Sequence, residues 1–124
     1  MTAIAMAGQD ISLIAGEDLS SQQFHFVKSA TTDFGVLLVT NATTSVPIGV
    51  LQDDPDASGK AATVRVSGNT KVVAGGTVTR GNTLTLLATG EVQNKSGSDT
   101  KVGVALESGV TGDVVSMVLH IGLP

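Results

Sequence analysis

Three aspartates in a short polar stretch are the first residues whose spacing could do chemistry. From Asp54 the chain reads Asp-x-Asp-x-Ser-Gly, with Asp53 just ahead of it, which matches the opening of a calcium-binding loop. The twelfth position of such a loop supplies a bidentate glutamate, and here it is Arg65. The flanking residues also read as strands, where a calcium loop has helices. We therefore interpret residues 53–59 as a polar turn and assign no metal to it.

A second stretch, residues 76–83, approximates a phosphate-binding loop. That motif needs a lysine that reaches the phosphates and a following helix whose N-terminus faces them. Asn82 stands at the lysine position, and residues 83–87 read as a strand. The sequence therefore predicts no nucleotide site, no other cofactor and no small-molecule substrate.

The remaining candidates for acid–base or covalent chemistry belong to no recognised motif. Only His25 and His120 could act as a base near neutral pH, and neither belongs to a catalytic signature. The chain contains no cysteine, which excludes thiol chemistry and disulfides. Lys95 lacks the small or methionine neighbours that a displayed carrier lysine needs. We interpret both histidines as structural and predict that the protein is not an enzyme.

Charge and hydropathy exclude two classes of partner. The net charge is −4, and the basic residues are scattered, whereas nucleic-acid binding needs clustered cations. No apolar run approaches the roughly 20 residues of a membrane span. The N-terminus also lacks the cationic start of a secretory signal. We expect neither a nucleic-acid nor a membrane partner.

The elements that must position these residues are short strands. Many β-branched residues, 15 glycines and few aromatic side chains favour an all-β chain with a core of Val, Leu, Ile, Ala and Thr. Strands with a turn every few residues are typical of a small, single-domain β-barrel or β-sandwich of antiparallel strands. The sequence leaves these two closures open.

Two similar segments, residues 47–68 and 101–122, organise the chain. Each reads as a short strand, a glycine-containing turn and a longer returning strand, which is a β-hairpin. Residues 70–93 between them read as an insert of further short strands. Residues 1–9 are small and uncharged, and they form either an extended N-terminal arm or a frayed end. We predict this arm followed by one β domain over residues 10–124.

Several short motifs, rich in glycine and aliphatic residues, follow one another in a fixed order. They are residues 10–20, 23–28, 47–52, 62–68, 71–76, 102–107 and 114–119. In this order and spacing they resemble the small head decoration proteins, or capsid cement proteins, of tailed bacteriophages and prophages. The resemblance spans about residues 10–121.

The resemblance implies a structural virion protein without catalytic residues. Such a protein would bind the major capsid protein at capsomer junctions on the outside of the head, as a homotrimer, and would stabilise the shell. It would be assembled in the host bacterial cytoplasm, which suits a chain without cysteine. The alternative is a tail or fibre β-module with a binding role, for example toward glycans. The absence of Trp and Tyr disfavours glycan binding.

Candidate contact residues follow from the apolar pattern. Residues 10–15 alternate, which places Ile11 and Leu13 on one face of a strand, and residues 24–28 alternate so that Phe24 and Phe26 lie side by side, in the core or at an interface. A core poor in rings gains from burial between subunits. We therefore expect Ile4, Ile11, Leu13, Phe24 and Phe26 to contribute to subunit or capsid contacts.

Overall fold

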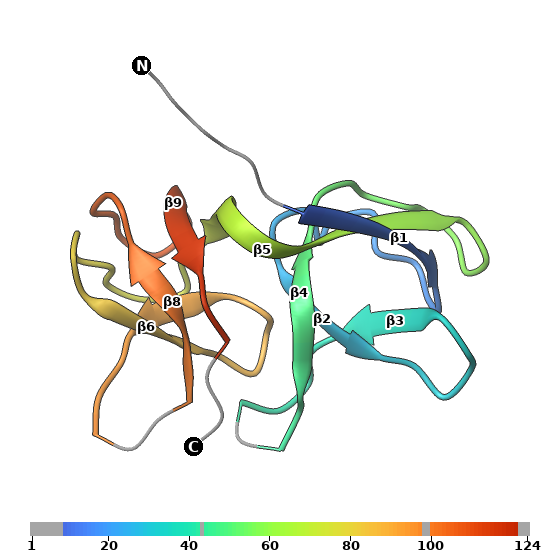
Figure 1. The fold of residues 1–124 in the computed structure, drawn as a ribbon, viewed down its shortest axis with the longest axis horizontal. Helices are drawn as coiled ribbons and strands as arrows, with labels where there is room; N and C mark the ends of the chain where they lie inside the picture. Colours follow the sequence, from blue (N-terminus) through green and yellow to red (C-terminus); the bar gives the residue numbers. More distant parts are fainter. Residues whose placement is uncertain (1–8, 43, 98–99, 122–124) are drawn as a thin grey trace.

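The computed structural model describes residues 9–42, 44–97 and 100–121, which fold into nine β-strands (Figure 1). The described residues contain no helix, so the prediction of an all-β chain is confirmed. The strands are β1 (Gln9–Ala15), β2 (Phe26–Ser29), β3 (Gly35–Leu38), β4 (Pro47–Leu51), β5 (Ala61–Val73), β6 (Thr83–Leu86), β7 (Val92–Asn94), β8 (Lys101–Ala105) and β9 (Val114–Leu119).

The first five strands close into a small barrel. Strand β1 pairs with β5 in the antiparallel sense and, through Ile14 and Ala15, with β3 in the parallel sense. Strand β3 pairs with β2, β2 with β4, and β4 with β5, all antiparallel. The sheet therefore returns to β1, and of the two expected closures the barrel is the one that forms. The parallel β1–β3 pair was not predicted.

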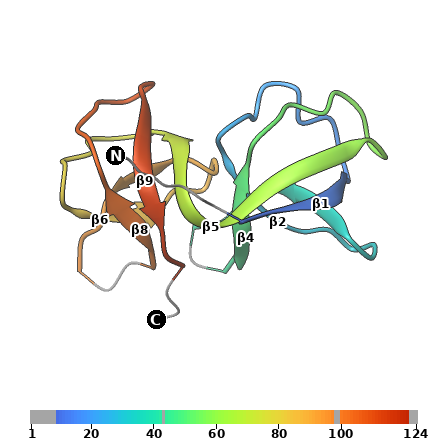
Figure 2. The same ribbon diagram turned by 45° about the horizontal axis from the view of Figure 1, so that its top comes forward.

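The remaining strands repeat this order around the second part of β5. Residues 68–73 of β5 pair with β9, β9 with β8, β8 with β6, and β6 with β7. A parallel bridge between Ala74 and Val92 takes the place of the β1–β3 pair. We call residues 9–67 the first half and residues 68–121 the second half. The halves lie side by side, and β5 crosses from one to the other (Figures 1 and 2).

Equivalent residues of the two halves make the same contacts. Gly59 and Gly112 share a φ of 94°, and each donates its N–H over 2.7 Å to an alanine carbonyl, Ala15 in the first half and Ala74 in the second. The buried interior residues also correspond in order. They are Ala15, Leu19, Val27, Val36, Leu51, Ala62 and Val64 in the first half, and Ala74, Val78, Leu84, Val92, Ala105, Val115 and Met117 in the second.

One strand differs from its sequence-based prediction. The chain pattern predicts a strand that ends near Val66 and a separate short strand at residues 71–73. Instead β5 is continuous over 13 residues. Gly68, with a φ of 89°, lies where the partner of β5 changes from β1 to β9. Glycine adopts this backbone without steric cost, so the strand bends and continues (Figure 2).

The two halves pack through the outer face of the first barrel. Phe26, Val39 and Val50 are fully buried and belong to the same apolar cluster as the interior of the second half. The Phe26 N–H donates over 2.8 Å to the carbonyl of Gly90, in the turn between β6 and β7. The second half therefore covers this face of the first half.

Phe24 does not extend β2 as the alternation predicted. Strand β2 begins at Phe26, and Phe24 has a φ of 65°, which a bulky side chain rarely adopts. Phe24 is nevertheless half-buried against the same cluster that contains Phe26. The two rings thus share an apolar environment without sharing a strand.

The predicted domain division is only partly within the described residues. Residues 1–8, most of the predicted arm, lie outside them, and Gln9 is the first residue of β1. The assignment of residues 10–124 to one domain with an insert at 70–93 stays a prediction.

The close approach of paired strands at Gly49 gives a stability prediction. A Cβ atom at this position would overlap the carbonyl oxygen of Arg65, and one at the equivalent Gly103 would overlap that of Val118. Because backbone cannot move aside cheaply, we expect Gly49→Ala to lower the free energy of unfolding by about 2 kcal/mol or more. Denaturant unfolding measures this. Ser67→Ala, at an exposed position of β5, is the control. A loss of unfolding free energy for Gly49→Ala no greater than the loss for Ser67→Ala would contradict the prediction.

Candidate functional site

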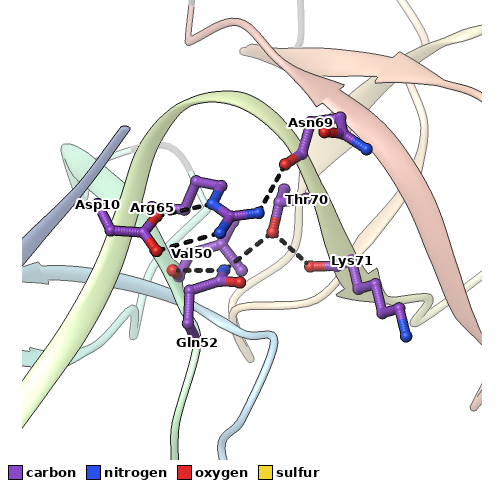
Figure 3. Close-up of polar contacts among 7 residues, drawn as sticks. All are labelled: Asp10, Val50, Gln52, Arg65, Asn69, Thr70 and Lys71. Atoms are coloured by element: carbon purple, nitrogen blue, oxygen red, sulfur yellow. Dashed lines mark hydrogen bonds and ion pairs between the residues drawn. The ribbon is translucent and has the colours of Figure 1, made fainter. Parts of the chain in front are cut away.

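A polar hollow lies where the two halves meet. Its volume is about 290 Å³, and its lining comes from both halves: Phe24, Gln52, Arg65, Asn69, Thr70, Lys71 and Ser116. Figure 3 shows most of these side chains around the bend of β5. The lining residues include a guanidinium, an ammonium, amides and hydroxyls, but no histidine or carboxylate that could act as a base. Their chemistry suits hydrogen bonding.

Arg65 is the most heavily engaged side chain of this hollow. Its Nε donates to Asp10 Oδ1 over 2.7 Å, and its Nη2 donates to Asp10 Oδ2 over 3.0 Å (Figure 3). Its Nη1 donates over 3.0 Å to the carbonyl of Asn69 in the second half. The hydrogen bonds from Arg65 lower the pKa of Asp10, and the Asp10 carboxylate raises the pKa of Arg65. The guanidinium thus ties β1 to the bend of β5.

A second set of bonds ties β4 to the second part of β5. The Gln52 side-chain amide donates to the Val50 carbonyl over 3.0 Å and to the Thr70 hydroxyl over 2.9 Å. The Thr70 hydroxyl donates in turn to the Lys71 carbonyl over 2.9 Å. Thr70 is buried, so these bonds satisfy a polar group that would otherwise be costly inside the protein. The hydrogen bonds of Arg65, Gln52 and Thr70 therefore hold the two halves together, and we call this set of bonds the polar bracket.

Two aspartates of the 53–59 turn contact residues that follow the turn. Both carboxylate oxygens of Asp53 accept the N–H of Thr63 over 3.2 Å. Asp56 forms an exposed ion pair with Lys60 at 2.5 Å, and the pKa of Asp56 is lowered by that partner. An open hollow of about 470 Å³ lies against this turn. Within the described part of the chain, no group of three or more His, Asp or Glu side chains could hold a metal ion.

His25 lies between the two halves. It is buried, its Nδ1 lies 3.1 Å from the Gln23 carbonyl, and its Nε2 lies 3.7 Å from Glu91 Oε2 of the second half. Glu91 also accepts the Thr89 hydroxyl over 2.7 Å. His120 is exposed at the end of β9. His25 therefore contributes to the joint between the halves.

The other stretches with chemical patterns form turns. In the phosphate-loop-like stretch, the Asn82 N–H donates to the Thr79 carbonyl over 2.9 Å, and the Thr79 N–H donates to Asn94 Oδ1 over 2.9 Å. The Lys95 ammonium donates to the Gly97 carbonyl within its own loop.

The candidate contact residues lie in different environments. Ile11 and Leu13 are half-buried against the interior of the first half, on one face of β1 as predicted. Phe24 is half-buried at the hollow, and Phe26 is fully buried inside the subunit. Ile4 lies outside the described residues. Contact of any of these residues with a second subunit or a capsid stays a prediction, and the Phe26 ring is already occupied in the interior.

Sequence reasoning missed a set of exposed apolar side chains. Phe34 is 74% exposed, and Leu106, Val110, Val114 and Val118 on the β8–β9 hairpin are 41–61% exposed. The alternation of residues 114–119 was the available signal, because it places Val114 and Val118 on the face opposite the buried Val115 and Met117. Phe34 belongs to the first half, and the other four side chains belong to the second half.

No helix in the residues that the structure describes is long and apolar enough to cross a membrane.

Comparison with known proteins identifies relatives of the chain. A family model described as phage cement protein matches residues 5–120. The solved structure of the head fiber gp8.5 N base of bacteriophage phi29 superimposes with a TM-score of 0.72 at 20% sequence identity, covering 95% of this chain and 99% of that one. At this identity the superposition shows a shared fold. No curated protein matches the chain.

The Asp10–Arg65 pair gives a pH-dependent prediction. The pKa of Asp10 is lowered in the fold, so its contribution to stability is full above its unfolded pKa and disappears as the pH falls through the folded pKa. Both side chains are partly exposed, so we expect Asp10→Asn to cost roughly 1 kcal/mol at neutral pH. Urea unfolding along a pH series should show the variant and the wild type converging in acid.

The matched control is Asp56→Asn, which removes a fully exposed ion pair and should leave the free energy of unfolding unchanged. A loss for Asp10→Asn that stays constant at all pH values would contradict a role of the charged pair.

Proposed function

The chain belongs to the phage cement protein family, and we propose that it binds the outside of a phage head at the junctions between capsomers and stabilises the shell. As a member of this family, it is a structural component of the phage particle. The match covers residues 5–120 and is the observation that carries the proposal. The partner that we propose is the major capsid protein.

The form of the fold supports a structural role. Two small barrels share one strand, and hydrogen bonds from Gln52 and Arg65 hold them against each other. A rigid unit of this kind can contact two neighbouring capsomers at once, one through each half. The net charge of −4 also disfavours attraction to packaged DNA.

We further propose that the protein acts as a homotrimer. The interior is built almost entirely from aliphatic side chains, and several large apolar groups remain exposed. Burial between subunits would add the stability that a core with few rings lacks. A stable contact should bury more than about 1,000 Å² in total.

A fibre base is the second candidate. The observation in its favour is the fold shared with the head fiber N base of bacteriophage phi29. Both candidates place the protein on a head, and they differ in whether it carries a further component.

Binding to heads is the direct test of the proposed function. Purified protein is mixed with empty expanded heads and sedimented, and the heads are then heated with and without it. We expect co-sedimentation and a higher disruption temperature for the decorated heads. Absence of co-sedimentation would overturn the proposal, and binding without any thermal effect would favour the fibre base.

The N-terminal arm provides a prediction within this proposal. Deletion of residues 1–8 leaves β1 intact, because that strand begins at Gln9. We expect the circular dichroism spectrum to stay β-rich while co-sedimentation with heads weakens at least several-fold, since apolar contact area is lost. A deletion variant that binds as well as the full chain would remove the arm from the contact.

The loops between the hairpin strands are the next candidates. Residues 53–59 and 107–113 occupy equivalent places in the two halves and differ in sequence, so alanine substitutions in either loop, tested in the same assay, would locate a loop contact.

A further inference from the structure

We propose that copies of this chain bind head to tail, with the β2–β3 turn of one copy seated on the outer face of β8 and β9 of the next. Phe34 and Ile14 form the inserting side, and Val104, Leu106, Val114 and Val118 form the receiving side. This contact would join the subunits of the homotrimer proposed above, and it rests on the proposed function only for the number of subunits.

Phe34 occupies a backbone conformation that suits glycine. Its φ is 61°, its side chain is 74% exposed, and its carbonyl accepts the N–H of Ile14 over 2.8 Å. Its equivalent in the second half is Gly90, with a φ of 82°. The correspondence follows from the parallel pairs, Ala15 with Val36 and Ala74 with Val92. The first half thus holds a strained aromatic residue at its surface, and strain of this kind concentrates at functional sites.

Phe24 is strained in the same way as Phe34, and its contacts show a role for such a residue. It is the other non-glycine residue with positive φ among the described residues, and its equivalent in the second half is Gly81, with a φ of 86°. Phe24 and Gly81 donate equivalent hydrogen bonds, to Leu51 over 2.8 Å and to Ala105 over 2.9 Å. The Phe24 ring packs against the apolar cluster that includes the interior of the second half, and the Phe24 carbonyl accepts the N–H of Val73 over 3.1 Å. The strained backbone of Phe24 therefore accompanies a contact between the two barrels. Phe34 has the same backbone conformation, but its side chain is exposed within one copy.

The receiving surface spans three strands, with the polar residues Ser116 and Lys71 between Val118 and Val114. Val118 lies opposite Val104 on β8, Val114 lies opposite Val73 on β5, and the Leu106 N–H donates over 2.9 Å to the carbonyl of Ser116 between them. Cross-strand neighbours of this kind have side chains in contact. Val118, Leu106 and Val114 are 41%, 46% and 48% exposed, so apolar side chains are accessible on this face.

The first half has a different surface at the equivalent positions. Arg65 stands in place of Val118, and Gln52 in place of Leu106, and both are held in the polar bracket. Val50 stands in place of Val104 and is fully buried by the second half. Where the second half covers this face of the first half, Val50 is buried and the side chains of Arg65 and Gln52 form polar bonds, whereas Leu106 and Val118 at the equivalent positions of the second half are exposed within one copy.

The contact inside one copy is the template for the contact between copies. Within the chain, the carbonyl of Gly90 in the β6–β7 turn accepts the N–H of Phe26 on β2, which pairs with β4. The equivalent turn carries Phe34, and the equivalent face is that of β6 and β8, with Val104 in place of Val50. The receiving side shares β8 with this face and extends from it to β9, and the turn and the receiving side lie on opposite halves. One copy can thus offer its turn to the next copy's face, which is a heterologous contact that closes into a ring when the rotation permits.

One pair of opposite charges lies at the two sides of the proposed contact. Asp33 precedes Phe34 and is exposed, and Lys71 is exposed on the receiving face opposite Ser116. A pairing of Asp33 with Lys71 would orient the encounter, although such rim pairs add little affinity, and the β8–β9 hairpin also carries the exposed acidic residues Glu107 and Asp113.

Cysteine cross-linking tests the contact without interference, because the chain has no cysteine of its own. Single variants Phe34→Cys and Val118→Cys are mixed and oxidised over a concentration series. We expect the mixed 34–118 dimer to exceed the 34–34 and 118–118 dimers several-fold. Val46→Cys, at an exposed apolar position outside both surfaces, replaces Phe34→Cys in the control mixture. A 34–118 yield no higher than the control yield overturns the proposal.

A second pair of variants uses substitutions that the fold already accepts at equivalent positions. Phe34→Gly copies Gly90, and Val118→Arg copies Arg65. We expect each variant alone to lose self-association in analytical ultracentrifugation, and their mixture to form a dimer through the one remaining intact contact. Retention of wild-type association by both variants, or no dimer in the mixture, contradicts head-to-tail binding. No heads are present, so failure of head binding would be a separate result.

Discussion

The continuity of β5 is the constraint on which the rest of the structure depends. Its first part closes the first barrel against β1 and β4, and its second part begins the second barrel against β9. Neither barrel has a complete set of strands without it. Gly68 allows the bend at which the partner changes, and the bonds of Arg65 and Gln52 across that bend fix the halves against each other. A shared strand of this kind couples the position of one barrel to that of the other.

The two halves use the same interior and different exteriors. Equivalent aliphatic side chains fill both barrels, and paired glycines such as Gly49 and Gly103 let the strands approach in both. The differences are at the surface, where Arg65 corresponds to Val118 and Phe34 corresponds to Gly90. A repeated scaffold with unlike faces suits a cement protein, because it can bind different neighbours with each half. It also explains how one chain can expose an aromatic turn on one barrel and an apolar sheet face on the other.

The sequence predicted the elements that have a local signal. The alternation of residues 10–15 located the inner face of β1, and the similarity of residues 48–52 to 102–106 located β4 and β8. The continuity of β5 was missed because Ser67-Gly68-Asn69 has the composition of a turn, and only the change of partner explains a glycine there. The full repeat was missed because β1 and the second part of β5 share shape but few residues. The exposed face of β9 and the positive φ of Phe34 depend on tertiary contacts that no local pattern records.

The central claim is that this chain decorates a phage head as copies that contact one another. A cryo-electron microscopy reconstruction of heads decorated with the purified protein measures this most directly. We expect density on the outer surface of the shell at capsomer junctions, in rings where the first barrel of each copy meets the second barrel of the next. Bare shells, or separate copies whose barrels touch no other copy, would contradict it.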